Sequence, residues 1–164
     1  MTDNEIPRNW NQLVKLVPIL PQMALENNFR SPAVQSIYEA YSKHTPKDIR
    51  TQILLKELGE SKTGLLYNHF YYDRLLKHLP YVRHLCYWYS DPNKEDKQIF
   101  NELNQIINGE SKTFSYDFIF FTNLPQAKSI PEFPHTHIFV NYGFAIPKSE
   151  FFKPQLSQEL YVRN

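Results

Sequence analysis

The stretch from Tyr116 to Val140 constrains the fold of this chain more than any other part of the sequence. It begins with the aromatic run Y-D-F-I-F-F-T-N, continues through a loop punctuated by prolines, and ends with H-T-H-I-F-V. Aromatic and β-branched residues favour strands, so the stretch predicts two strands joined by a loop. Side chains alternate between the two faces of a strand, and His135 and His137 are therefore expected to point to the same side of a sheet.

The first half of the chain carries helix signals instead. Apolar residues at helical spacing predict a first helix over residues 10–17, which Pro18 is expected to end. Residues 31–32, S-P, have the types preferred at the N-cap and the first helical position, and they predict a second helix. Residues 45–46, T-P, repeat this signal for a third helix that ends at Gly59.

The second half alternates between strand and helix patterns. Residues 60–79 are interpreted as a surface loop followed by a short helix around Tyr72 to His78. Residues 80–89 form an aromatic run that predicts a strand, and residues 94–109 carry the apolar stripe and terminal Asn-Gly of an amphipathic helix. The order predicts an α+β fold, with a mainly antiparallel sheet, helices packed on one face, and a helical N-terminal half.

Length and composition narrow the class of protein. A chain of 164 residues fits a single domain, 1–164, in which residues 1–9 and 148–164 are expected to be irregular or loosely packed. The 18 basic and 17 acidic side chains nearly cancel, which argues against a nucleic-acid partner. The single cysteine, Cys86, cannot form an internal disulfide, and no signal peptide or membrane span is visible. These features predict a cytoplasmic protein without a membrane partner.

Four blocks of sequence carry a resemblance to a known family. They are I-P-R-N-W-N-Q-L-V, F-R-S-P-A-V-Q-S-I-Y-E-A-Y, L-P-Y-V-R-H-L-C-Y-W and F-F-T-N-L-P-Q-A-K-S-I-P-E-F-P-H-T-H-I-F-V. In this order, over most of residues 6–142, they resemble the fungal N-acetylglucosamine-induced protein family. The resemblance implies a cytosolic protein connected with the response to amino sugars, in a family whose biochemical activity is not established.

The second half is also similar to the histidine-triad (HIT-like) fold, in which a strand, a helix, a strand ending in Asn and a strand with spaced histidines follow one another. That resemblance implies that His137 is the nucleophile in nucleotidyl or phosphoryl transfer or hydrolysis, and that His135 is the first triad histidine. It also implies that Asn123 and Ser129 belong to a phosphate-binding loop. Phe139 stands at the third histidine position and offers no hydrogen bond.

Further candidates for a ligand site come from the residue types alone. Lys128 and Arg83 are the cations that could stabilise a phosphate, and Trp88 could stack on a sugar or base ring. His84, on the strand before the helix, completes the ligand-binding set and could share a metal ion with the histidine pair. No acidic residue stands at a recognisable ligand spacing, so no metal and no cofactor are predicted.

Two functional hypotheses follow. The first is a domain that binds or acts on a phosphorylated amino sugar or nucleotide-sugar through His135 and His137, with the question of catalysis left open. The alternative is a non-catalytic adaptor that binds another protein and in which the histidine pair is structural, its polar atoms satisfied by backbone groups.

Overall fold

A four-stranded antiparallel sheet forms the centre of the computed structural model, which describes residues 1–109, 115–128 and 133–143. The strands lie in the order β1-β2-β4-β3. Their bounds are β1 Gly64–Tyr67, β2 Val82–Trp88, β3 Asp117–Phe121 and β4 His135–Asn141. The two central strands, β2 and β4, are almost entirely buried, as strands covered on both faces must be.

The register of the sheet decides which side chains meet on one face. Cys86 of β2 lies opposite His137 of β4, and Trp88 lies opposite His135. Directly paired residues share a face, and so do residues two apart along one strand. His84 therefore joins these four side chains on a single face of the sheet.

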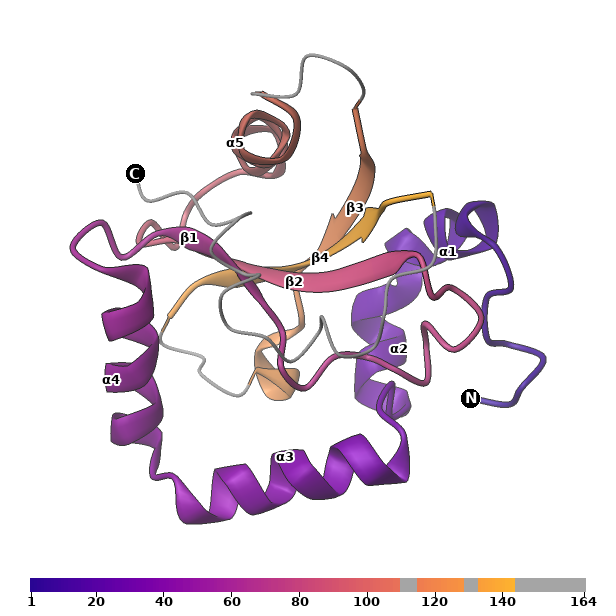
Figure 1. Ribbon diagram of the computed structural model, residues 1–164, viewed down its shortest axis with the longest axis horizontal. Helices are drawn as coiled ribbons and strands as arrows, with labels where there is room; N and C mark the ends of the chain where they lie inside the picture. Colours follow the sequence, from indigo (N-terminus) through magenta and orange to yellow (C-terminus); the bar gives the residue numbers. More distant parts are fainter. Residues whose placement is uncertain (110–114, 129–132, 144–164) are drawn as a thin grey trace.

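Helices cover both faces of the sheet (Figure 1). Leu13 and Leu20 pack in a core on the face that carries His137, whereas Ile99 and Leu103 pack on the opposite face. The predicted α+β fold, with an antiparallel sheet and a helical first half, is confirmed. The expectation that helices pack on one face holds only for the N-terminal helices. The opposite face of β2 and β4 is buried as well, and a later helix covers it. The helices are α1 Trp10–Leu16, α2 Leu20–Glu26, α3 Pro32–His44, α4 Lys47–Leu58 and α5 Asp96–Asn108.

The prolines after α1 begin new helical turns. The α1 helix begins after Asn9, whose side chain accepts a hydrogen bond from the backbone N–H of Gln12, and it ends near Pro18 as expected. Pro18 and Pro21 then take early positions in the 3₁₀ turn Val17–Ile19 and in α2. The sequence interpretation missed α2, because proline is compatible with the first helical turn, where the missing N–H has no partner to lose.

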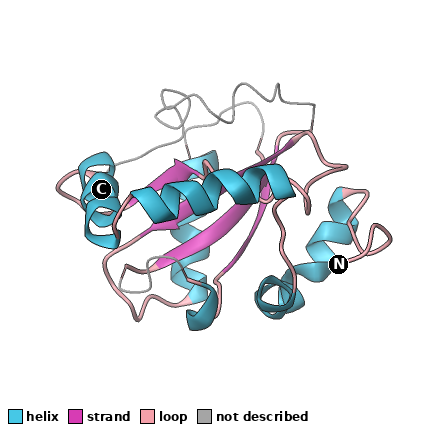
Figure 2. Ribbon diagram, turned by 90° about the horizontal axis from the view of Figure 1, so that it is seen from below, coloured by secondary structure: helices cyan, strands magenta, loops and turns pink. Residues whose placement is uncertain are grey.

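The helices α3 and α4 match the predicted second and third helices. Ser31 caps α3, since its hydroxyl accepts a hydrogen bond from the N–H of Val34 at 3.3 Å. The α4 helix ends at Gly59, which has the positive φ of 74° that glycine adopts without strain. None of the residues in α3 is buried, although the helix runs across one side of the sheet (Figure 2).

The region between α4 and β2 differs from the sequence interpretation. Residues 64–67 form β1, which pairs with β2, and residues 73–78 form turns where a short helix was expected. Four residues are too few to show the side-chain alternation of a strand, so β1 is recognised only from its pairing with β2. The chain from Asn68 to Tyr81 then passes over the sheet face that carries the histidines, which places Tyr72 against them.

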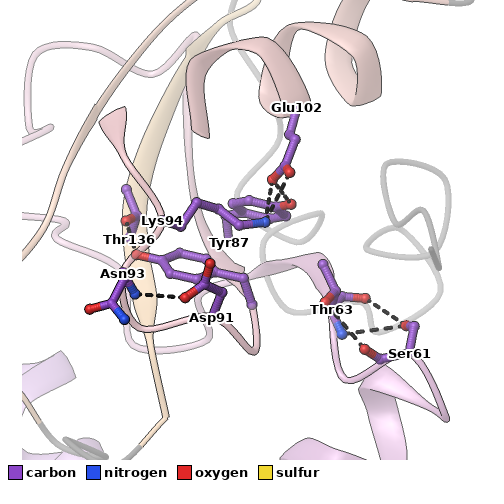
Figure 3. A network of polar contacts seen from close by, with 9 residues as sticks. Ser61, Thr63, Tyr87, Asp91, Asn93, Lys94, Glu102 and Thr136 are labelled. Atoms are coloured by element: carbon purple, nitrogen blue, oxygen red, sulfur yellow. Dashed lines mark hydrogen bonds and ion pairs between the residues drawn. The ribbon is translucent and has the colours of Figure 1, made fainter. Parts of the chain in front are cut away.

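On the opposite face, α5 is attached to the sheet by a polar network (Figure 3). The hydroxyl of Tyr87, on β2, donates to Glu102 of α5 at 2.6 Å. Lys94 donates to the two carboxylate oxygens of Glu102 at 2.9 and 2.7 Å. This arrangement orients α5 on the strand that also carries His84 and Cys86.

The two ends of the chain differ in how much of them the structure describes. Residues 1–9 contain no helix or strand, yet Ile6 is only 2% exposed and so is part of the packed structure. Residues 148–164, predicted to be irregular, lie outside the described residues. Within the described part of the chain, no helix has the length and apolar character needed to cross a membrane.

Candidate functional site

Two neighbouring strands bring His84, Cys86 and His137 together beneath the loop that follows β1. His84 Nε2 lies 2.9 Å from His137 Nδ1, and Cys86 Sγ lies 3.6 Å from the same nitrogen. All three side chains are buried, with exposed fractions of 0%, 6% and 4%. The sheet register produces this cluster, since each residue sits on the same face at neighbouring positions.

Tyr72 covers the cluster from the loop. Its backbone N–H donates to His84 Nδ1 at 3.0 Å, and its ring stacks on His137 with centroids 5.1 Å apart. The Tyr72 hydroxyl lies 3.4 Å from His137 Nε2. Burial raises the pKa of Tyr72 to about 12, so the hydroxyl is protonated at neutral pH.

Asn123 completes the ring of contacts around His137. Its side-chain amide lies 2.9 Å from His137 Nε2 and 3.3 Å from the Tyr72 hydroxyl. Asn123 follows β3, whose last residue, Phe121, pairs with His137 and stacks on it at 5.3 Å. Both ring nitrogens of His137 thus have partners, and a role as nucleophile would require the Asn123 contact to break.

Burial keeps the cluster uncharged. It holds the pKa of both His84 and His137 well below the usual range, and the guanidinium of Arg30 lowers both pKa values further. The neighbouring His84 and His135 also lower the pKa of His137. Burial raises the pKa of Cys86 to about 12, so the sulfur is a thiol and not a reactive thiolate.

His135 has a different environment from His137. Its Nδ1 lies 3.0 Å from the carbonyl oxygen of Phe133, so Nδ1 carries the proton and donates to that oxygen. Its ring stacks on Trp88 with centroids 4.2 Å apart. Burial lowers the pKa of His135, which leaves Nε2 with a lone pair, and among the described residues this nitrogen has no hydrogen-bond partner.

A cavity of about 410 Å³ lies between this sheet face and the helices α3 and α4. His135, His137 and Asn123 line its sheet side, while Arg30 and Arg50 bring positive charge to its wall. Arg30 Nε donates to the Phe70 carbonyl at 2.7 Å, and its guanidinium lies over the rings of Tyr38 and Tyr72, at 4.5 and 5.0 Å from their centroids. The remaining wall is largely aromatic and includes Tyr38, Tyr41, Phe70 and Trp88.

The predicted site residues divide into four groups, the last of which is Arg83 alone. His84, Trp88, Asn123, His135 and His137 do come together, on the cavity or directly behind it. Lys128 lies near enough to the histidines for its charge to lower the pKa of both His135 and His137. Ser129 lies outside the described residues.

Arg83 is not part of the site, contrary to the sequence prediction. It alternates with His84 on β2 and therefore points to the opposite face of the sheet. There it donates to the Tyr67 hydroxyl and lies 4.8 Å from the centroid of the Tyr142 ring. A strand position next to a site residue faces away from the site, which the alternation rule already implied.

Several residues of the site were missed. Arg30, in the bend before α3, and Arg50, on α4, lie far from the histidines in sequence, and Tyr72 comes from a loop interpreted as a short helix. Cys86 was interpreted as a packed strand residue, and it is indeed buried. His84 and Cys86 form an H-x-C pattern on one strand, and His135 and His137 form an H-x-H pattern on the other. This spacing of two is the sequence signal that indicated a shared face.

The cluster has the atoms for a metal site but not the hydrogen-bonding pattern. His84 Nε2, Cys86 Sγ and His137 Nδ1 lie within 4.8 Å of one another. A histidine that binds a metal through Nε2 carries its proton on Nδ1 and donates it. Here the Tyr72 N–H points at His84 Nδ1, and the amide nitrogen of Asn68 points at Cys86 Sγ from 3.5 Å. These donors favour a hydrogen-bonded cluster without an ion.

Comparisons with known proteins inform the fold alone. The sequence matches no known family and no curated protein. The structure is similar to the crystal structure of a protein named HTC1, with a TM-score of 0.56 and 17% sequence identity over 92% of each chain. The similarity extends over nearly the whole of both chains, so it concerns the arrangement of the complete domain and not one motif.

Proposed function

We propose that the chain binds a small phosphorylated ligand of the amino-sugar class in the cavity between the sheet and α3–α4. The observation that carries the proposal is Arg50, whose Nε is buried and has no hydrogen-bond partner among the described residues. A buried N–H without a partner is costly, and phosphate oxygens are the acceptors that guanidinium groups bind best. A bound phosphate would satisfy this donor.

Arg30 supports the same ligand class from another side of the cavity. Its Nε is occupied by the Phe70 carbonyl, which fixes the plane of the guanidinium and leaves its two terminal nitrogens as donors. The Arg30 guanidinium lies 5.0 Å from the centroid of the Tyr72 ring, and its charge lowers the pKa of His84 and His137. Two guanidinium groups on one cavity favour an anion.

The rest of the wall suits a sugar ring. Trp88, Tyr38 and Tyr41 offer aromatic faces, while His135 Nε2 and the carboxylate of Glu57 accept hydrogen bonds from hydroxyl or amine groups. The volume of about 410 Å³ lies near the lower end of the range of about 300–1,000 Å³ for ligand pockets. That size favours a sugar phosphate over a nucleotide-sugar.

The resemblance to N-acetylglucosamine-induced proteins supports an amino sugar, and a cytosolic location belongs to the same proposal. Thermal unfolding with N-acetylglucosamine 6-phosphate, glucosamine 6-phosphate and UDP-N-acetylglucosamine tests the proposal. A ligand at 100 times its Kd stabilises the native state by about 2.7 kcal/mol, which raises the Tm by about 5–10 °C for a chain of this size. We expect this shift with a sugar phosphate.

Variants of α4 supply the control for that titration. Arg50→Gln is expected to abolish most of the shift, because it removes the charge at the cavity wall. Lys56→Gln removes the same charge from an exposed position of the same helix that does not line the cavity, and it should retain the shift. Equal shifts in both variants would contradict the assignment of Arg50.

The adaptor hypothesis has one supporting observation. Ile37, on α3, and Ile49, on α4, are exposed to 60% and 40%, and exposed apolar side chains are candidates for a protein-binding surface. If no sugar phosphate or nucleotide-sugar raises the Tm, the adaptor becomes the better proposal, and Ile37→Ser with Ile49→Ser would be expected to abolish partner binding.

A further inference from the structure

The hydrogen bonds around the buried histidines fix the position of each proton. The backbone N–H of Tyr72 is a donor, so His84 Nδ1, 3.0 Å away, accepts with its lone pair. A neutral imidazole carries one proton, which must then lie on His84 Nε2. That nitrogen is 2.9 Å from His137 Nδ1, so His84 donates and His137 accepts.

The same reasoning places a proton on His137 Nε2. Because Nδ1 of His137 is an acceptor, the neutral ring carries its proton on Nε2, which makes that nitrogen a donor. The Asn123 atom placed 2.9 Å from it is the amide nitrogen, also a donor, while the amide oxygen is buried without a partner among the described residues. Two donors facing each other do not form a hydrogen bond.

One rotation resolves both conflicts. Turning the Asn123 amide by 180° places its oxygen against His137 Nε2 and the Tyr72 hydroxyl, which both donate to it over 2.9 and 3.3 Å. Reversing the proton order instead would leave His84 with a lone pair on each nitrogen, an anionic imidazolate in a buried site. With the rotated amide, every contact of 3.3 Å or less among Tyr72, His84, His137 and Asn123 joins a donor to an acceptor. The amide nitrogen of Asn68 lies 3.4 Å from His84 Nε2, too long for a strong competing bond, and donates instead to Cys86 Sγ at 3.5 Å.

We infer that Tyr72, His84 and His137 form a one-way hydrogen-bond chain that makes the amide nitrogen of Asn123, a residue of the cavity wall, an unpartnered buried donor. There it donates to an oxygen of the ligand. Asn123 lines the cavity and is 7% exposed. After the rotation, its amide nitrogen is the atom without a partner among the described residues. His84 and His137 act as positioning residues, since they set the polarity of Asn123 without touching the ligand through their own protons.

This inference rests on the proposed function, and it adds a third donor to those of Arg30 and Arg50. All three groups donate, so the part of the cavity that they line is predicted to select ligand groups that only accept, such as phosphate oxygens.

Nitrogen-15 NMR of the imidazole rings of the wild-type protein tests the chain directly. We expect His84 and His137 both to carry their proton on Nε2 at pH 7.5. A proton on His137 Nδ1 or an imidazolium at either ring would overturn the inference. Loss of the His84 Nε2 proton on adding Zn²⁺ would also overturn it, in favour of a metal site.

The ligand-facing part is tested by adding N-acetylglucosamine 6-phosphate. The side-chain NH₂ signal of Asn123 is expected to shift, and Asn123→Asp should weaken binding at least tenfold because a carboxylate cannot donate. Asn101→Asp, which makes the same change on the exposed side of α5, is the matched control and should bind normally. If Asn123→Asp does not fold, the shift of the wild-type NH₂ signal still decides.

The two proposals fail in distinguishable ways. If the ring protons are as expected but no sugar phosphate binds the wild-type protein, the proposed function fails and the donor role of Asn123 fails with it, while the order of the chain stands. If the sugar phosphate binds and the Asn123 NH₂ signal does not move, only the donor role is overturned.

Discussion

At the scale of single residues, the buried histidines are held in their neutral form by burial and by one another. His84 and His137 share one hydrogen bond of 2.9 Å. A second proton between these two nitrogens would make both of them donors, and the bond would be lost. The same cluster contains Cys86, whose thiol remains protonated. The site therefore presents hydrogen-bonding groups of fixed polarity, and its buried histidines carry no charge.

Acid is expected to destabilise the protein below about pH 6.5. In the unfolded chain the histidines take up protons near this pH, whereas burial keeps the pKa of His84 and His137 well below it in the folded protein. The unfolded state then binds more protons, and stability that is full above pH 6.5 is lost as the pH falls. The expected loss is up to about 1.4 kcal/mol per pH unit for each histidine.

Urea unfolding between pH 5.5 and 7.5 measures this loss. His137→Asn is expected to reduce the slope of the free energy of unfolding against pH, while His44→Gln, at an exposed position of α3, should leave it unchanged. A wild-type free energy that does not vary over this range would show that the histidines are not held neutral.

The sequence predicted part of the site and not the rest. The alternation rule correctly placed His135 and His137 on one face, because it depends only on local backbone geometry. It did not assemble His84 and Cys86 against them, because the pairing of β2 with β4 joins residues 53 and 51 positions apart. Tyr72 lies 65 positions from His137 and comes from a loop, where no periodicity exists to read.

At the scale of elements, helices with clear capping residues were predicted well and short elements poorly. The α3 helix begins at the Ser-Pro pair and α4 ends at its glycine, since these residues act locally, Ser31 through its hydroxyl and Gly59 through its backbone conformation. The α2 helix and β1 have 7 and 4 residues and depend on packing for their stability. Contacts with the rest of the fold, which the local sequence pattern does not show, determine whether α2 and β1 form.

The attachment of α5 gives a prediction at this scale. Glu102→Gln removes the negative charge that accepts hydrogen bonds from Tyr87 and Lys94 in a partly buried site. Hydrogen bonds to charged groups contribute about 1.5–3 kcal/mol, so we expect the free energy of unfolding to fall by about 1–3 kcal/mol. Urea denaturation with an unchanged m-value measures the effect.

Glu95→Gln is the control for this prediction. Glu95 precedes α5, is exposed, and makes no capping hydrogen bond with its side chain. The free energy of unfolding should change by no more than about 0.5 kcal/mol, as is usual for surface substitutions. If both variants lose the same stability, the network around Glu102 does not hold α5 on the sheet.

At the scale of the whole molecule, the sheet carries a packed core on each face, and the cavity lies where the core on the histidine face ends. One core joins α1 and α2 to Phe139 and Phe121, and the other joins α5 to Tyr87 and Ile138. Next to this core, α3 has no buried residue, while α4 buries Leu54 and Leu58 against Leu66 of β1. The cavity lies between the sheet and these two helices, where the proposed ligand would bind.

The central claim is that the cavity recognises the phosphate group, and isothermal titration calorimetry tests it most directly. N-acetylglucosamine and its 6-phosphate differ only in that group, and hydrogen bonds to charged groups contribute about 1.5–3 kcal/mol. We therefore predict that the 6-phosphate binds the wild-type protein at least about tenfold more tightly, because tenfold corresponds to about 1.4 kcal/mol. Arg50→Gln should remove that difference. Equal Kd values for the two sugars in the wild-type protein, or no binding of either, would contradict the account.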